Sequence, residues 1–142
     1  MATMEQPART PLGGVLADLL EDNLLGLTRN DRLWKLYFLR PTSEMDEPVE
    51  HRIYTKLQED GKLGLVSYSI RMAGNQDPIR SQLAYSEGIP EDTLNNTIWN
   101  VVQQTGLGPD DLQIIDLGQY ATLQEQIGAL LELASMDAPK AE

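Results

Sequence analysis

The stretch His51–Met72, HRIYTKLQEDGKLGLVSYSIRM, decides the fold, because two runs with strand composition flank one strong turn signal. Asp60-Gly61 favours the positive backbone φ angles of a two-residue hairpin turn. The runs His51–Gln58 and Leu63–Met72 alternate apolar with polar residues, as half-buried strands do. The stretch therefore predicts an antiparallel β-hairpin.

Two more segments with strand composition flank this hairpin. Leu33–Leu39 and Ile79–Ser86 are rich in aromatic, leucine and β-branched residues and are bounded by turn formers. The acidic segment Pro41–Val49 and the loop Ala73–Pro78 connect them to the hairpin. Four strands joined by such short connections favour antiparallel pairing, because parallel strands need a long crossover.

Helical patterns precede and follow these strands. Apolar residues recur every three or four positions over residues 11–27, which predicts an amphipathic helix. A second helix is expected over residues 90–106, with proline and acidic residues at its start and glycine at its end. After a predicted strand over residues 112–117, Thr122 and Glu125 form a capping-box pattern that begins the last helix.

Together these elements predict an α+β fold: a mainly antiparallel sheet of four to five strands with three helices packed on one face, in the order α-β-β-β-β-α-β-α. A chain of 142 residues suits one domain, which we place at residues 11–135. Residues 1–10 and 136–142 lack hydrophobic periodicity and are expected to be flexible tails. With all helices on one face, the other face of the sheet would be open to water.

The composition excludes several kinds of chemistry. The chain has no cysteine and a single histidine, so it cannot form disulfides, thiolate metal sites or a zinc site of cysteine and histidine ligands. No catalytic motif and no cofactor-binding motif stands out, so no catalytic residue and no cofactor is expected. The first residues lack the basic start and apolar run of a secretory signal, which favours a cytoplasmic protein.

The charges are unevenly distributed along the chain, whose net charge is −11. Residues 29–80 contain nine of the eleven basic residues and eight acidic ones, whereas residues 81–139 contain nine acidic residues and no lysine or arginine. Self-repulsion among these acidic residues is a cost that the composition alone does not require. A strand region with a net charge of +1 is therefore expected to sit on an acidic body.

Strand alternation assigns side chains to the two faces of the sheet. With a two-residue turn, His51 lies opposite Ile70 at the edge of the core. On the fourth strand, Ile79, Leu83 and Tyr85 are assigned to the core. The residues between these core positions are expected to face water.

The predicted open face gathers basic and tyrosine side chains. Arginine and tyrosine are enriched in the hot spots of protein interfaces, although a solvated face that discourages edge pairing has the same composition. The predicted partner-binding residues are Lys35, Tyr37, Arg52, Tyr54, Lys56, Arg71 and Arg80.

The sequence therefore favours a non-enzymatic protein-interaction module, such as an adaptor, a client-specific chaperone or a regulatory or assembly subunit. Its expected partner is another protein, and self-association between basic and acidic surfaces is also possible. Neither a membrane nor nucleic acid is an expected partner.

Two alternatives stay open. The first is a small enzyme that depends on carboxylates or a divalent cation, or a cation-binding protein, because a hard cation prefers several carboxylate oxygens. The second is a single-stranded nucleic-acid binder, in which bases stack on the tyrosines of the sheet. The candidates for a cation site are Glu44, Asp46, Glu47 and Glu50.

Overall fold

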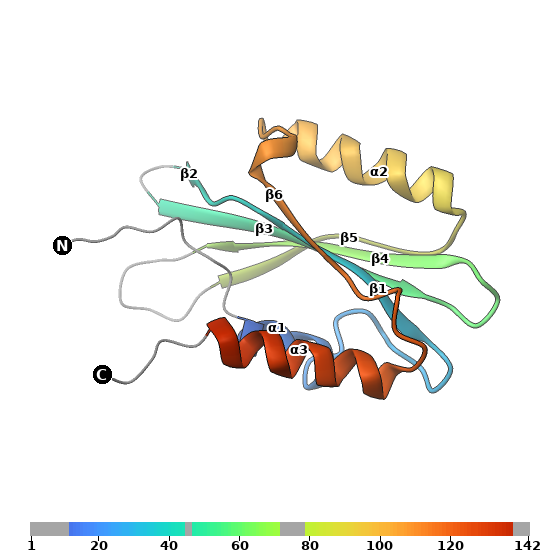
Figure 1. Cartoon of the computed structure of the whole chain (residues 1–142). Coiled ribbons are helices and arrows are strands. Elements are labelled where there is room, and N and C mark those ends of the chain that lie inside the picture. The colour runs from blue at the N-terminus through green and yellow to red at the C-terminus, as the bar shows by residue number, and fades with distance from the viewer. Residues whose placement is uncertain (1–11, 45–46, 72–78, 138–142) are drawn as a thin grey trace, which may run out of the picture.

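A computed structural model describes residues 12–44, 47–71 and 79–137 (Figure 1). The described residues confirm the predicted α+β class and the order α-β-β-β-β-α-β-α, to which they add one short strand and a 3-10 turn. In chain order the elements are α1 (Leu12–Leu20), β1 (Arg32–Leu39), β2 (Thr42–Glu44), β3 (Glu47–Leu57), β4 (Leu63–Arg71), β5 (Ile79–Ile89), α2 (Glu91–Gln104), η1 (Pro109–Asp111), β6 (Leu112–Asp116) and α3 (Leu123–Asp137).

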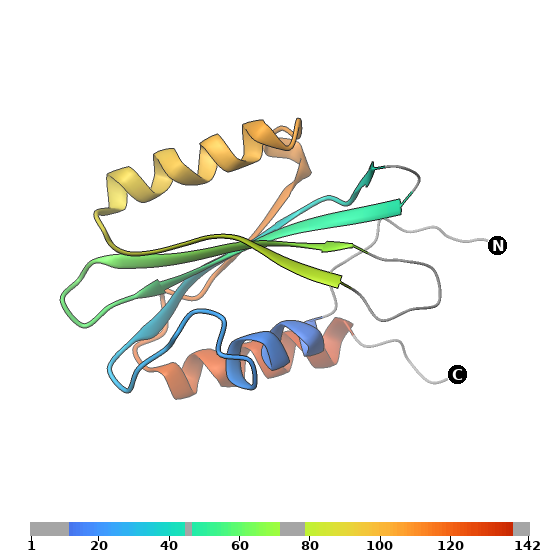
Figure 2. The same cartoon turned by 180° about the vertical axis from the view of Figure 1, so that it is seen from behind.

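The strands form one antiparallel sheet in the order β5-β4-β3-β1-β6, and the short β2 pairs with β3. The predicted hairpin, β3 and β4, lies at the centre of this order. β5 and β6 are the two edges, and Figure 2 looks onto the β5 side of the sheet.

The helices cover both faces of the sheet, so the prediction that all three lie on one face is wrong. α1 and α3 lie side by side on one face, here named the α1 face, and α2 lies on the opposite α2 face (Figures 1 and 2). The reason is visible in β1, which sends Leu36 and Phe38 into the core under α1 and Tyr37 and Leu39 into the core under α2. A strand that is apolar on both sides needs cover on both sides.

The β3–β4 hairpin differs from the prediction by one residue in register. Leu57 pairs with Leu63, and the Gln58 amide donates to the Lys62 carbonyl over 2.8 Å. Gly61, at a φ of +87°, donates its amide to the Gln58 carbonyl over 2.9 Å. This is a three-residue hairpin loop closed by a left-handed glycine, not a two-residue turn. A slip of one residue changes which side chains of the two strands share a face.

A Gly61→Ala substitution tests this turn. A Cβ at Gly61 would meet nothing within 4 Å, so the expected loss of about 1 kcal/mol in the free energy of unfolding comes from the left-handed φ alone. Gly128→Ala in α3 is the matched control, since its Cβ also enters open space, and it should gain about 1 kcal/mol from helix propensity. Urea unfolding measures both, and an equal response at the two positions would contradict the turn geometry.

The first helix ends at Leu20, before the predicted end at residue 27. Asn23 has a φ of +48°, and its side-chain Oδ1 accepts a hydrogen bond from the Leu27 amide over 2.8 Å. Leu24 and Leu25 still pack against the core of the α1 face from this turn. The leucine spacing therefore predicted burial correctly for this turn, although the helix ends before it.

The start of the last helix follows the prediction. The Glu125 amide donates to Thr122 Oγ1 over 3.1 Å, and Glu125 Oε1 accepts from the Thr122 amide over 3.3 Å. The next residue, Gln126, is buried. Its Oε1 accepts a hydrogen bond from the Leu33 amide, and its Nε2 donates to the carbonyls of Leu33 and Leu117, which connects α3 to β1 and to the end of β6. Among the described helices, none has the length and apolar character needed to cross a membrane.

Candidate functional site

The sheet face that was expected to be open to water is covered by α1 and α3. Tyr54 and Lys56 are at most 1% exposed, and Arg52 is 6% exposed. The hairpin register causes this burial, because it pairs Tyr54 with Val66 and Arg52 with Tyr68 instead of with outward serines. The prediction that these three side chains face water is therefore wrong.

The other predicted residues do not form one surface with them. Tyr37 is buried under α2, where burial raises its pKa to about 12. Lys35 is half-buried, with its Nζ 5.6 Å from the centroid of the Trp34 ring. Arg71 is half-buried at the end of β4, and Arg80 lies on β5 with 41% of its side chain exposed. The seven residues are thus divided between both faces and one edge.

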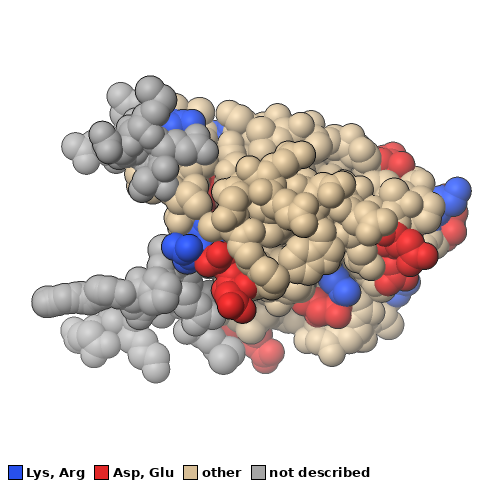
Figure 3. Space-filling model, turned by 90° about the horizontal axis from the view of Figure 1, so that it is seen from above, with Lys and Arg blue, Asp and Glu red and all other residues tan. Residues whose placement is uncertain are grey.

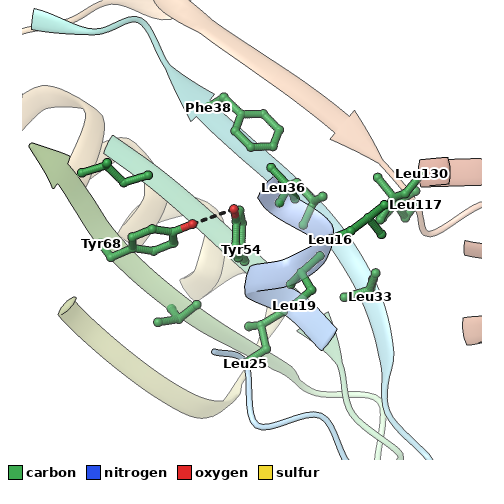
Figure 4. Packing of buried hydrophobic residues seen from close by; sticks show 13 residues of the cluster. Leu16, Leu19, Leu25, Leu33, Leu36, Phe38, Tyr54, Tyr68, Leu117 and Leu130 are labelled. Carbon is green, nitrogen blue, oxygen red and sulfur yellow. Dashed lines mark hydrogen bonds between the residues drawn. The ribbon is translucent and has the colours of Figure 1, made fainter. Parts of the chain in front are cut away.

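A group of side chains, here named the polar cluster, joins α1 to the sheet, and all but the exposed Arg80 are buried: Asp18, Arg52, Tyr54, Tyr68 and Arg80. Asp18 Oδ2 accepts hydrogen bonds from the Tyr68 hydroxyl over 2.5 Å and the Tyr54 hydroxyl over 3.3 Å. The oxygen atoms of the two hydroxyls are 2.6 Å apart, and Figure 4 marks the hydrogen bond between them. Arg52 Nη1 lies 3.4 Å from Asp18 Oδ2, and Arg80 Nη1 pairs with Asp18 Oδ1.

The surroundings of the polar cluster fix its protonation. Burial raises the pKa of both Tyr54 and Tyr68 above the usual value, so both phenols stay protonated and donate hydrogen bonds. Burial alone would lower the pKa of Arg52, but the Glu50 carboxylate, whose Oε1 lies 3.2 Å from Arg52 Nη2, raises it. The cluster is therefore a charge-assisted connection between one helix and two strands.

A second group, the lysine cluster, lies at the other end of the same face: Asp31, Lys56, Tyr85 and Glu87. Lys56 Nζ is 2.7 Å from Glu87 Oε2, 3.4 Å from Asp31 Oδ2 and 3.1 Å from the Gly26 carbonyl oxygen. Burial alone would lower the pKa of Lys56, but the hydrogen bond to Glu87 raises it. The same hydrogen bond lowers the pKa of Glu87. The ammonium group is thus held charged inside the protein.

Two shallow hollows border these clusters, and both reach the β5 side of the molecule. One, of about 380 Å³, lies at the lysine cluster and is lined by Thr28, Asp31, Lys56, Gln58, Glu59, Asp60 and Glu87. The other, of about 290 Å³, lies at the polar cluster and is lined by Asp22, Leu24, Val66, Tyr68, Arg80 and Gln82.

The long edge strand β5 is the most exposed regular element of the described chain. Every residue from Ile79 to Gly88 is exposed. Ile79 and Leu83, which were assigned to the core, are 51% and 55% exposed, and Tyr85 is 39% exposed. That core assignment is wrong because β5 ends the strand order and borders β4 alone among the described strands.

The surface above α2 differs in character from β5. Figure 3, seen from the α2 side, shows a middle without charged residues and charges around its rim. The sequence explains this, because residues 93–109 carry no charge. Trp99 is 43% exposed on this helix, whose other exposed residues include Asn95, Asn96, Asn100, Gln103 and Gln104.

The candidate cation loop is only partly described. Asp46 and the side chains of Glu44 and Glu47 lie outside the described residues. Glu50 Oε1 bonds Arg52 Nη2 over 3.2 Å. Among the residues that the structure does describe, no group of three or more histidine or carboxylate side chains is arranged to hold a metal ion.

The fold and these surfaces define an α+β protein that buries Arg52 and Lys56 and leaves its long edge strand exposed. Comparison of the chain with protein-family models, with curated proteins and with solved structures gives no match in any of the three.

Proposed function

We propose that this chain is a non-enzymatic protein-interaction module that binds an extended segment of a partner polypeptide along β5. The observation that carries the proposal is the exposure of this edge strand over eleven residues, of which only Ile89 is buried. The proposal keeps the class of function that the sequence favours and moves the contact surface from the covered sheet face to the edge.

An open edge strand presents unpaired backbone N–H and C=O groups, which another extended chain can pair with. Soluble proteins usually protect such edges with short strands, lysine side chains or proline. β5 is eleven residues long and contains neither lysine nor proline, although its sequence, IRSQLAYSEGI, has two charged residues, Arg80 and Glu87, and its pairing with β4 is irregular at two points. A long edge that is left open in this way is suited to pairing.

The apolar side chains of β5 also favour the addition of a strand. Ile79, Leu83 and Tyr85 are large side chains that are all more than a third exposed. Pairing with an added strand would cover them, while the backbone hydrogen bonds supply affinity. This combination supports binding of a peptide segment better than binding of nucleic acid, because β5 offers one basic residue.

A Leu83→Lys substitution is expected to weaken partner binding by at least about tenfold, because a lysine on the edge disfavours strand addition. Leu131→Lys on α3 is the matched control, since Leu131 is 56% exposed and Leu83 is 55% exposed. The protein is immobilised, a partner is captured from its native host, and the affinity of the purified partner for each variant is then measured.

Hydrogen exchange on the purified complex locates the contact. The backbone amides of residues 79–89 should gain protection on binding, and those of α3 should not. A partner that binds the Leu83→Lys variant as tightly as the Leu131→Lys variant, or that protects another element, would contradict the proposal.

A further inference from the structure

We infer that the segment that pairs with β5 is β5 of a second copy of this chain, so that two copies form one continuous antiparallel sheet. This inference rests on the proposed use of the β5 edge and adds the identity of the partner. It follows from the order of the residues on β5 and from the faces to which their side chains point.

The β5 sequence is complementary to itself when two copies are laid antiparallel. With Leu83 opposite the partner's Ala84, the chain direction brings Arg80 opposite the partner's Glu87, and Glu87 opposite the partner's Arg80. The two charged residues of the strand thus meet residues of opposite sign twice. Opposite charges on facing strands stabilise a pair of strands, and like charges destabilise it.

Because of a bulge in β5, residues at equal distances from the strand centre point to the same face of the sheet. Tyr68 pairs with Gln82 and Ser67 pairs with Ala84, so Leu83 is an extra residue on β5. This extra residue restores the same pattern of faces on both sides of the strand centre.

The pairings of β5 with β4 and the contacts of Glu87 assign these faces. Arg80 lies on the α1 face opposite Ile70, and Glu87 lies there too because it bonds Lys56. Gln82 and Tyr85 also lie on the α1 face, opposite Tyr68 and Val66. Residues directly opposite in an antiparallel pair share a face. With Leu83 opposite the partner's Ala84, Arg80 and the partner's Glu87 share the α1 face, and so do Gln82 and the partner's Tyr85.

On the α2 face, too, directly opposite residues come from the same side of the sheet. Ser81 pairs with Ser69 and Ser86 pairs with Leu65, so both serines lie on the α2 face, and the register places them opposite each other. Leu83 lies at the centre, opposite the partner's Ala84 and next to the partner's Leu83, so the second strand would cover it. A shift by one residue would place α1-face residues opposite α2-face residues.

The charged side chains are also available for this contact. Arg80 has 41% and Glu87 has 46% of the side chain exposed. The bonds of Glu87 to Lys56 and Tyr85 both use Oε2, and a guanidinium group has five N–H donors, more than the contacts to Asp18 and Asp22 require. The pairing uses the same patch on both chains, so it closes at two copies.

Disulfide trapping tests the register, because the chain contains no cysteine of its own. Ser81→Cys and Ser86→Cys proteins are mixed in equal amounts and oxidised slowly. The mixed disulfide should exceed each symmetrical disulfide by at least about tenfold, since only the mixed pair faces across the two-fold axis at a distance that a disulfide can span. Symmetrical disulfides in equal or greater yield would overturn the register.

Analytical ultracentrifugation of the unmodified chain tests the second copy itself. The sedimenting mass should double with rising concentration, Leu83→Lys should abolish this change and Leu131→Lys should not. A monomer at every concentration would overturn the inference of a second copy but leave the proposed edge binding to its own test with the host partner. A dimer that Leu83→Lys leaves intact would overturn both uses of β5.

Discussion

Replacement of Asp18 by alanine is expected to lower the free energy of unfolding by about 3–5 kcal/mol, the range seen when one partner of a buried ion pair is removed. The Asp18 carboxylate is 6% exposed and accepts hydrogen bonds from Tyr54 and Tyr68 while facing Arg52 and Arg80. Without it, the Arg52 guanidinium, itself 6% exposed, loses its contact with α1. Chemical unfolding followed by circular dichroism measures the loss.

Asp22→Ala is the control for this prediction. Asp22 also pairs with Arg80, over 2.6 Å, but both side chains are about two-fifths exposed. An exposed ion pair contributes about 0–1 kcal/mol, so this variant should unfold nearly as the unmodified chain does. If the two substitutions lowered the free energy of unfolding equally, burial would not explain how much Asp18 stabilises the fold.

The class of fold was predictable because it depends on local patterns. Alternating strands, the glycine at the β3–β4 turn and the Thr122–Glu125 capping box are all signals within a few residues of one another. Each of these elements is present in the structure. What the patterns could not supply was the exact length of the hairpin loop, since Asp-Gly occurs both in two-residue turns and before bulges.

The one-residue difference in the register of the β3–β4 hairpin is the reason why the predicted partner-binding surface does not exist. The expected turn placed Tyr54 and Lys56 on a face with serines and Arg71, whereas the observed turn places them beside Val66 and Gly64. Gly64 leaves room for the Lys56 side chain, whose Cε lies 2.7 Å from the position that a Cβ of residue 64 would take. Arg52 and Lys56 are therefore internal partners of carboxylates: Arg52 pairs with Asp18 and Glu50, and Lys56 pairs with Asp31 and Glu87.

The exposure of β5 was not predicted from the sequence. The strand order, which shows that β5 is an edge, depends on pairings between distant residues. One signal was available: β5 contains serines, glutamine and an Arg80–Glu87 pair, where β1 has a nearly continuous apolar run. A mixed composition of this kind is typical of a strand with little cover.

Alkaline pH is expected to destabilise the fold strongly, because three tyrosines are buried as neutral phenols. Burial raises the pKa of Tyr37 from 10.0 to about 12, with smaller contributions from the carboxylates of Asp116 and Glu91. Burial also raises the pKa of Tyr54 and Tyr68. Above pH 10 the unfolded chain releases these protons and the folded chain keeps them, so the folded state binds more protons and stability falls as pH rises.

The contribution of Tyr37 is fully present below pH 10, and its loss amounts to about 1 kcal/mol at pH 11 and about 2 kcal/mol at pH 12. Urea unfolding at about pH 8 and about pH 11 measures the fall, and the absorbance of tyrosinate shows when the phenols ionise. Tyr37→Phe is the control, since it removes one buried phenol and should make the fall shallower. If all five tyrosines ionised near pH 10 while circular dichroism still showed a folded chain, the buried phenols would not limit stability.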